Sequence, residues 1–382
     1  MTIDKIYSLS LSILLLSACS TKNIEKKEPI QEHNENNKTE SFQFLEVSGG
    51  DLNQTEDLPL PTVSYDELQG EFQGNYNLLE FIDMMVTVHN FDRKYLNEIF
   101  SQAKDYNLIP QTRSCVSNVV MGKVGAWDRY RNCFIYERNI ERGVKFWEEH
   151  EDALNNAEAK YGVPAKYIIG ILGIETAYGV NFGKHRVIDV LTTRSMLGDR
   201  RSSFYRDELE KYLLITRDIG LNPIELMGST SGALGYGQFM PSSYMRFAID
   251  FNSDGKKDLW DAEDAIGSIA NYFAENGWNP SIPKVTVRAR YKGNRFKRLK
   301  TGYKTKYSLD KLKKKYHIIP REKFNPYGKV SLIKLPRGTY DELWLGSPNF
   351  RVITTYNHST YYGMTAYQLG EEVAKRRKER GY

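Results

Sequence analysis

Cysteine is scarce in this 382-residue chain, which has three cysteines, no CxxC pair and no Cys/His cluster. A zinc site is therefore not indicated. The net charge is only +5, from 53 basic and 48 acidic residues, too little for the whole molecule to behave as a polycation on nucleic acid. Apolar residues make up 40% and aromatic residues 13% of the chain, enough for the packed core of one large or two modest domains.

Long apolar runs are also missing. Residues 7–18 form an apolar stretch of about half the roughly 20 residues that a helix needs to cross a bilayer, which is typical of a signal-peptide core. The stretch ends in Leu16-Ser17-Ala18-Cys19, similar to a bacterial lipobox; the alternative is an ordinary secretory signal that happens to end in cysteine. With lipidated Cys19 first and Ser20 next, we expect the mature chain on the periplasmic face of the outer membrane, anchored in its lipid.

The composition divides the chain into five parts. Residues 1–18 are the predicted lipoprotein signal peptide, and the polar residues 19–75 are predicted to be a disordered tether, because they offer too little apolar area to offset chain entropy. Residues 76–283 are predicted to be α-helical, residues 284–350 to form a basic β-containing region, and residues 351–382 to return to the core.

Apolar periodicity predicts the main helices. A helix over 139–161 has its buried stripe at Val144, Trp147, Leu154 and Tyr161, whereas the helix after Pro164 is apolar on every face up to Glu175. Further helices are predicted before Gly220 and over 244–249 and 262–275. After residue 283, alternating apolar residues predict short strands around Val285 and Val287, Val330 and Leu332, and Val352 and Thr354. The fold is predicted to be mainly α.

The region 284–329 is strongly basic, with 17 Lys and Arg residues against Asp310 and Glu322. One interpretation is a solvated surface held apart by like charge. The other is contact with a polyanion, such as the carboxylates of peptidoglycan stem peptides or anionic lipid head groups. Nucleic acid does not fit an exported, lipid-anchored chain.

Glu175 is the candidate acid. A carboxyl that follows an all-apolar helical run is desolvated and lies near the negative end of the helix dipole, and both effects favour its neutral form. A carboxyl that is protonated near neutral pH can donate to a leaving oxygen and later take a proton back, as glycosidic cleavage requires. The alternative is a buried glutamate neutralised by a lysine or arginine.

Two loops follow. Residues 228–243 are rich in glycine, so that backbone can approach a flat ligand closely, and Gln238 and Ser229 offer hydrogen bonds for sugar recognition; the alternative is a purely structural turn. The loop lacks the lysine and the spacing of a phosphate-binding loop.

Residues 250–261 carry oxygen ligands at loop positions 1, 3 and 5 and glycine at position 6, the pattern of an EF-hand-type loop for a hard cation. The expected Ca²⁺ ligands are Asp250, Asn252, Asp254 and the Lys256 carbonyl. Position 12 is an aspartate rather than a glutamate, so Asp264, one turn further on, is expected to close the site instead. The alternative is a polar turn that binds nothing.

Together these motifs resemble the membrane-bound lytic murein transglycosylase B family, glycoside hydrolase family 103. The resemblance rests on Gly173-Ile174-Glu175-Thr176-Ala177-Tyr178-Gly179, the 228–243 loop, the DxNxDG loop and residues 265–273, and it runs over 127–278 and again over 352–359. It implies a lysozyme-like α-helical catalytic core, an added α domain, a small β-containing region and an EF-hand-like loop holding a structural Ca²⁺, with no organic cofactor.

The resemblance also implies an activity. Such enzymes cleave the β-1,4 bond between N-acetylmuramic acid and N-acetylglucosamine in peptidoglycan glycan strands without water, leaving 1,6-anhydromuramyl ends. Position by position, Glu175 matches the single catalytic acid and base, and Asp264 the distal calcium ligand. Ser229, Gln238, Tyr272 and Tyr356 match positions that line the sugar groove. The alternatives are a hydrolytic lysozyme, with Asp189 or Asp199 as second carboxylate, and a non-catalytic peptidoglycan-binding lipoprotein.

Three features depart from the family pattern. The basic region is unusually long, and Ser231 stands where the family has a small alanine. Cys115 and Cys133 have no family role; a disulfide between them is permitted outside the cytoplasm, and two separate buried thiols fit the sequence equally well.

Overall fold

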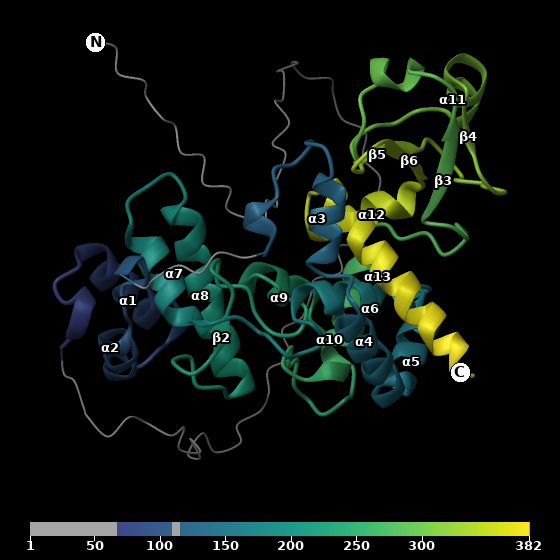
Figure 1. Ribbon diagram of the computed structural model, residues 1–382. Coiled ribbons are helices and arrows are strands. Elements are labelled where there is room, and N and C mark those ends of the chain that lie inside the picture. The colour runs from purple at the N-terminus through teal and green to yellow at the C-terminus, as the bar shows by residue number, and fades with distance from the viewer. Residues whose placement is uncertain (1–66, 109–114, 382) are drawn as a thin grey trace, which may run out of the picture. The chain divides into compact units, whose positions relative to one another are not determined.

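The computed structural model describes residues 67–108 and 115–381 (Figure 1). The predicted signal peptide, the lipidation residue Cys19 and the predicted tether up to residue 66 lie outside the described residues. Within the described part, no helix combines the length and the apolar character that crossing a bilayer requires.

The described chain is mostly helical, which confirms the predicted fold class. Up to residue 283 its elements are η1 (Gly70–Phe72), α1 (Tyr76–His89), α2 (Arg93–Gln102), η2 (Tyr106–Leu108), η3 (Cys115–Asn118), α3 (Ala126–Asn132), α4 (Glu137–Glu149), α5 (Glu151–Tyr161), α6 (Ala165–Glu175), β1 (His185–Arg186), α7 (Val187–Met196), α8 (Ser202–Ile219), β2 (Met227–Gly228), α9 (Pro241–Phe247) and α10 (Ala262–Glu275). The later elements are β3 (Thr286–Tyr291), η4 (Arg295–Arg298), α11 (Leu309–Tyr316), β4 (Ile318–Pro320), β5 (Ser331–Pro336), β6 (Asp341–Gly346), α12 (Pro348–Tyr356) and α13 (Thr360–Glu379).

The described residues begin before the boundary predicted at residue 75. Leu68 and Phe72, which flank and end η1, are buried in the main hydrophobic cluster. A few well-placed apolar residues thus anchor the end of a stretch whose average composition is polar.

The single helix predicted over 139–161 is wrong, because α4 and α5 meet at His150. This residue has φ −123° and ψ 32°, outside the helical range. Its amide still donates to the Phe146 carbonyl, and its carbonyl accepts from the Leu154 amide. Val144 and Leu154 are both fully buried, so the apolar spacing continues across the break and conceals it.

Helices α6 and α13 approach each other closely through two glycines. A Cβ atom on Gly170 would lie 2.1 Å from the carbonyl oxygen of Ala366, and one on Gly370 would lie 2.0 Å from that of Lys166. Neither position accepts a side chain in this packing. Figure 1 shows α13, in yellow, passing beside α6.

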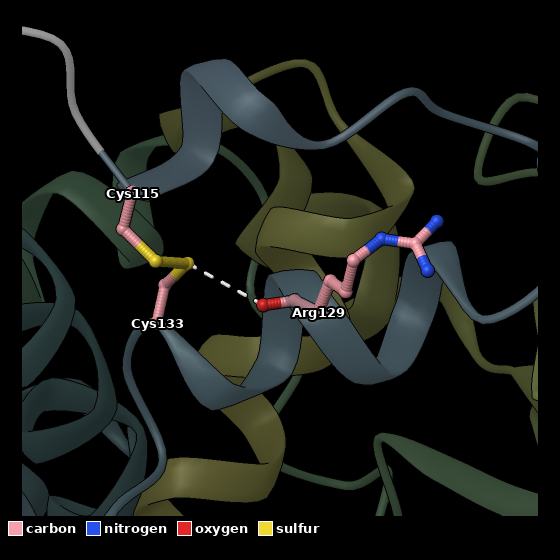
Figure 2. The surroundings of a disulfide bond; sticks show 3 residues. All are labelled: Cys115, Arg129 and Cys133. Atoms are coloured by element: carbon pink, nitrogen blue, oxygen red, sulfur yellow. Dashed lines mark hydrogen bonds between the residues drawn. A yellow bond between two sulfur atoms is a disulfide. The ribbon is translucent and has the colours of Figure 1, made fainter.

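A disulfide joins Cys115 to Cys133, with Cα atoms 5.8 Å apart (Figure 2). Cys115 begins η3, and Cys133 directly follows α3 and also contacts the Arg129 carbonyl through its sulfur, at 3.4 Å. The bridge therefore closes the segment that contains η3, the loop of residues 119–125 (the 119–125 loop) and α3. Of the two possibilities that the sequence left open, the structure has the disulfide.

The basic region folds around an antiparallel sheet with strand order β4-β3-β6-β5. The strands predicted around Val287 and Leu332 are confirmed as β3 and β5. Both residues are buried in a second hydrophobic cluster, to which α11 adds Leu312. Charge on the surface of this region thus coexists with an apolar centre.

The strand predicted around Val352 and Thr354 is wrong, since both residues lie in α12. Proline occupies the first turn of this helix at Pro348, where its missing N–H costs nothing. Phe350, Val352 and Ile353 are buried against the main cluster. Packing of these residues outweighs the strand preference of β-branched side chains.

Candidate active site

Glu175 is the last residue of α6. The preceding helix is embedded in the core, with Ile168 and Ile171 fully buried, but the Glu175 side chain keeps partial exposure. The Tyr362 hydroxyl donates a hydrogen bond to Glu175 Oε1 at 2.5 Å. The carboxyl thus lies where the core meets solvent, held by a residue of α13.

Burial raises the pKa of Glu175 from 4.5 to about 7, and the hydrogen bond from Tyr362 offsets part of this rise. The direction is the one expected from the apolar helix. Within the described residues, no lysine, arginine or second carboxylate contributes to the shift, so the neutralising cation of the alternative interpretation is not found there. Near neutral pH both forms of the carboxyl are populated, which suits a group that must donate and then accept a proton.

Tyrosines surround the carboxyl. Burial, followed by the charge of Glu175, raises the pKa values of Tyr130, Tyr356 and Tyr362, so their hydroxyls stay protonated. The rings of Tyr356 and Tyr362 are nearly parallel, with centroids 6.4 Å apart, and Tyr272 packs edge-on against Tyr356 at 4.9 Å. These four side chains, the tyrosine group, form an aromatic and hydrogen-bonding surface next to the acid.

The 228–243 loop is tied to this site by two hydrogen bonds. Thr176 Oγ1, next to the acid in sequence, donates to the Tyr236 carbonyl at 3.1 Å, and the Tyr356 hydroxyl donates to the Gly237 carbonyl. A Cβ atom on Gly237 would lie 2.8 Å from the Tyr356 hydroxyl. The Tyr356 hydroxyl therefore requires glycine at position 237, whether or not a ligand also approaches this backbone.

Gln238 and Ser229 both help to fold the loop. Gln238 Nε2 donates to the Phe182 and Gly235 carbonyls, each at 3.0 Å, and the residue has φ 50°, which is rare for a non-glycine. Ser229 Oγ accepts from two amides of the loop, at 3.0 and 3.2 Å. Both side chains are partly exposed. Both side chains therefore have a structural role in the loop, and their contact with sugar stays a prediction.

The structure brings some of the predicted groove residues together. Tyr272 and Tyr356 lie in the tyrosine group, and Gln238 follows Gly237, which is hydrogen-bonded to Tyr356. Among the described residues, the side-chain hydrogen bonds of Ser229 stay within its own loop and do not reach the tyrosine group. Sequence reasoning missed Tyr362, although the mostly apolar run 361–369 indicates a second buried helix.

The predicted cation loop is folded around its own oxygen atoms. The Asp250 carboxylate accepts from the amides of Asp254 and Gly255, at 3.1 and 2.9 Å, and Asn252 Oδ1 accepts from Asp254 at 3.0 Å. Asp254 Oδ1 accepts from the Lys256 amide at 2.8 Å. These bonds place oxygen donors of the hard type in one tight turn, as a calcium loop does. Among the described residues, no group of three or more His, Cys, Asp or Glu is arranged to hold a metal. Two of the five predicted ligands, the Asn252 amide oxygen and the Lys256 backbone carbonyl, are not of these types.

Asp264 is fully buried at the start of α10. Its oxygens accept from the amides of Phe251, Asn252 and Asp258, at 2.7 to 3.2 Å. Burial raises its pKa, and these amides lower it in part. Asp264 therefore holds both ends of the loop, and its carboxylate has the chemistry of the predicted closing ligand.

This helical fold, with a carboxyl of raised pKa at the end of a buried helix, indicates the class of lysozyme-like glycan-cleaving enzymes. The chain belongs to the Transglycosylase SLT domain family, whose model matches residues 74–371.

The relatives of this chain are lytic transglycosylases. The chain is 44% identical over 313 residues to the membrane-bound lytic murein transglycosylase B of Escherichia coli (strain K12), covering 81% of this chain and 85% of that protein. Two solved structures of the Escherichia coli lytic transglycosylase SLT35, one in complex with bulgecin A and one in complex with calcium, are each 45% identical with a TM-score of 0.74. Each match covers 81% of this chain and 96% of the SLT35 chain.

Proposed function

We infer that this chain is a lytic transglycosylase of peptidoglycan, and we propose that it cleaves the β-1,4 bond between N-acetylmuramic acid and N-acetylglucosamine to leave 1,6-anhydromuramyl ends. Family membership supports the class of reaction. The observation that carries the mechanism is Glu175, a partly exposed carboxyl with a pKa near 7 that is hydrogen-bonded to Tyr362.

In the first step, protonated Glu175 donates its proton to the glycosidic oxygen as the bond from that oxygen to C1 breaks. The carbonyl oxygen of the muramyl N-acetyl group forms a bond to C1 and gives an oxazolinium ion, as in substrate-assisted glycosidases. The substrate supplies its own nucleophile, so one protein carboxyl is sufficient.

In the second step, ionised Glu175 takes the proton of the muramyl 6-hydroxyl. The freed oxygen bonds to C1 and displaces the acetamido oxygen, which closes the anhydro ring and returns Glu175 to its acid form. Tyr362 holds the carboxyl in place through both steps. Ser229, Gln238, Tyr272 and Tyr356 are proposed to hold the distorted sugar and to exclude water, which favours ring closure over hydrolysis.

A hydrolytic lysozyme would need a second carboxylate across the cleft, and the two predicted candidates are engaged elsewhere. Asp189 is 3% exposed and receives two hydrogen bonds from Arg186, both at 2.8 Å. Asp199 accepts from the Arg201 amide at 2.7 Å in the turn before α8. These contacts favour the mechanism with one carboxyl.

The test is mass analysis of the muropeptides that purified protein releases from peptidoglycan. We expect anhydromuramyl products from the wild type and near-total loss with Glu175→Gln, whose amide cannot protonate the leaving oxygen. Glu208→Gln is the matched control, because Glu208 is another buried carboxyl with a raised pKa, on α8. Reducing-end sugars would refute the transglycosylase mechanism, and full activity of Glu175→Gln would refute catalysis by this acid.

Calcium is proposed to bind Asp250, Asn252, Asp254, the Lys256 carbonyl and Asp264. When bound it would supply charge neutralisation that fixes the connection between α9 and α10, and it would take no part in bond cleavage. EDTA should lower the melting temperature and Ca²⁺ should restore it, since a ligand that binds only the folded state stabilises it. Asp254→Ala should abolish this response and Glu175→Gln should keep it. An EDTA-insensitive melt of the wild type would eliminate the site.

The proposed location is the periplasmic face of the outer membrane, with lipidated Cys19 as anchor. Support comes from the lipobox-like sequence before Cys19 and from the membrane-bound relative. Membrane fractionation of the wild type and of Cys19→Ala tests this proposal. Release of the variant alone into the soluble periplasm is expected, and equal distribution of the two proteins would contradict it.

A further inference from the structure

The lysines and arginines of the basic region lie on its surface. Of the 17 such residues in 284–329, 15 are exposed, and the other two, Lys284 and Arg288, are partly buried. With two acids against these 17 bases, the region has a net charge of +15. The helical region 67–283, which contains Glu175, has 23 basic and 30 acidic residues, a net charge of −7. The two regions therefore differ in the sign of their charge.

Helix α11 presents three of the exposed bases on one face. Lys311, Lys314 and Lys315 are exposed and follow one another at helical three- and four-residue spacing from Lys311. Leu312 lies on the other face and is fully buried in the second hydrophobic cluster. The single acid of this helix, Asp310, lies in its first turn. Three positive charges thus cover the outer face of α11.

Two bases from other elements lie beside this face. Arg295 of η4 contacts the Lys315 carbonyl through Nη1 at 3.5 Å, which places η4 at the C-terminal end of α11. Arg290 of β3 is exposed and is the register partner of Ile319 on β4. Figure 1 shows α11 beside β4, which pairs with β3. We call these five bases the cationic surface: Arg290, Arg295, Lys311, Lys314 and Lys315.

The protein does not neutralise the cationic surface itself. Within the described part of the chain, none of its five side chains forms an ion pair. The ion pairs of the basic region and its sheet use four other bases, namely Lys284, Arg288, Lys334 and Arg337. Like charges at helical spacing destabilise a helix, so an anion from outside the molecule would stabilise this surface.

An apolar side chain lies among the bases. Ile319 is 44% exposed, whereas the preceding Ile318 is fully buried, and β4 is an edge strand of the sheet. An exposed isoleucine on a strand edge is an aggregation hazard in water. Next to lysine and arginine it suits a bilayer interface, where bases contact head groups and an apolar side chain enters the acyl boundary. Carboxylates of the cell wall would match the charges but not Ile319, so the combination favours lipid.

We propose that the cationic surface and Ile319 dock on anionic phospholipid head groups. The leaflet concerned is the one that holds the proposed anchor at Cys19, which is 48 positions before residue 67 and hence at most about 160 Å of extended chain away. Each base near an anionic leaflet adds an attraction that falls off within a Debye length.

Docking of this kind gives the bound enzyme a preferred orientation. The leaflet attracts the basic region and repels the helical region 67–283, whose net charge is −7. The inference goes beyond the proposed function, because lipid binding by this surface is separate from bond cleavage. Its vesicle test does not depend on the proposed location, since the protein tested carries no lipid.

The test is co-sedimentation of the mature chain with lipid vesicles. The Cys19→Ala substitution gives a mature chain without lipid. Anionic vesicles contain phosphatidylglycerol and phosphatidylcholine in equal parts, and neutral vesicles contain phosphatidylcholine alone. The protein should bind the anionic vesicles at least tenfold more tightly than the neutral ones, and added salt should weaken this binding. Equal binding to both kinds of vesicle overturns the proposal.

Substitutions locate the binding surface. Lys311→Gln, Lys314→Gln and Lys315→Gln together should weaken binding to anionic vesicles about a hundredfold, since each base near the leaflet contributes about fivefold. Glutamine keeps the helix preference of lysine. The matched control makes the same change in net charge with three exposed lysines on α2, α5 and α13 and should bind like the parent protein: Lys94→Gln, Lys160→Gln and Lys378→Gln. An equal loss in this control overturns the proposal.

Ile319→Thr tests the apolar contribution. Threonine keeps the β-branched shape that suits a strand but removes apolar area, so binding to anionic vesicles should weaken about fivefold. Unchanged binding of this variant would reduce the surface to a general polyanion site and overturn the assignment to lipid.

Peptidoglycan is the rival partner. Purified sacculi are titrated with the same proteins carrying Glu175→Gln, which should bind without cutting. Weaker binding to sacculi after the three α11 substitutions, with vesicle binding unchanged, would assign the surface to the wall and overturn the proposal. The α11 substitutions should leave kcat/KM on soluble glycan strands unchanged. Absence of anhydro products with every protein would refute the proposed function and leave the vesicle result standing, so the two failures are distinct.

Discussion

Removing the Tyr362 hydroxyl should move the loss of activity to higher pH. The hydroxyl donates to Glu175 Oε1 at 2.5 Å and lowers the pKa of this carboxyl against the larger effect of burial. Tyr362→Phe keeps the ring that stacks with Tyr356 and deletes only the donor. The ionised carboxyl loses more than the neutral acid does, so the pKa of Glu175 rises.

The size of the shift follows from the strength of this one hydrogen bond in the two protonation states of Glu175. A hydrogen bond to a charged acceptor contributes about 1.5–3 kcal/mol and one to a neutral acceptor about 0.5–1.5 kcal/mol. The difference, about 1–1.5 kcal/mol, corresponds to about one pKa unit. Since the free enzyme must hold Glu175 in its acid form, kcat/KM falls above the pKa. The alkaline limb should therefore move from about pH 7 to about pH 8 in the variant.

The assay is the pH dependence of kcat/KM for release of anhydromuropeptides from soluble glycan strands. Tyr212→Phe is the control, because Tyr212 is a fully buried tyrosine on α8 whose hydroxyl donates to the Pro223 carbonyl. A carbon-13 NMR titration of the Glu175 carboxyl measures the same shift without turnover. A limb that stays in place or moves to lower pH in Tyr362→Phe, with the NMR titration in agreement, would refute the assignment of Tyr362.

Three further predictions concern stability. The pKa of Glu175 is raised from 4.5 to about 7 on folding, so the wild type loses stability as pH rises through this window, and Glu175→Gln does not. The difference between their melting temperatures should therefore change in favour of the variant as pH rises. A difference that stays constant with pH would contradict the shift. Cys133→Ser removes a bridge between residues 18 positions apart and should cost about 3 kcal/mol in urea unfolding, whereas an equal midpoint for both proteins would contradict a stabilising bridge. Gly170→Ala places a Cβ atom 2.1 Å from the Ala366 carbonyl and should cost about 1–3 kcal/mol through overpacking; Gly338→Ala, in open space, should be neutral, and equal effects of the two would argue against the close helix contact.

The raised pKa of Glu175 was predictable because its signal in the sequence is local. An apolar helix that ends in one carboxylate predicts burial of that carboxyl, and burial has a larger effect on the pKa of Glu175 than the hydrogen bond from Tyr362. The oxygen-rich loop at 250–261 is local in the same sense, since its hydrogen bonds join residues a few positions apart.

Tyr362 was not predictable in this way. It reaches Glu175 from 187 positions further along the chain, and its place depends on the close packing of α6 against α13 through Gly170 and Gly370. Apolar periodicity indicates that both helices are buried, but it does not say which helices are neighbours. The same limit explains α12, where packing around Phe350 decided for a helix against the strand preference of its β-branched residues.

The order of synthesis gives α13 a particular consequence. Every ribosome-bound or prematurely ended chain that stops after residue 175 and before residue 360 contains the carboxyl of Glu175 but neither its hydroxyl partner nor the helix that packs along α6. A wall-degrading activity therefore comes last in the maturation of the polypeptide. Incomplete chains that reach the envelope should be harmless to the wall that the finished enzyme cuts.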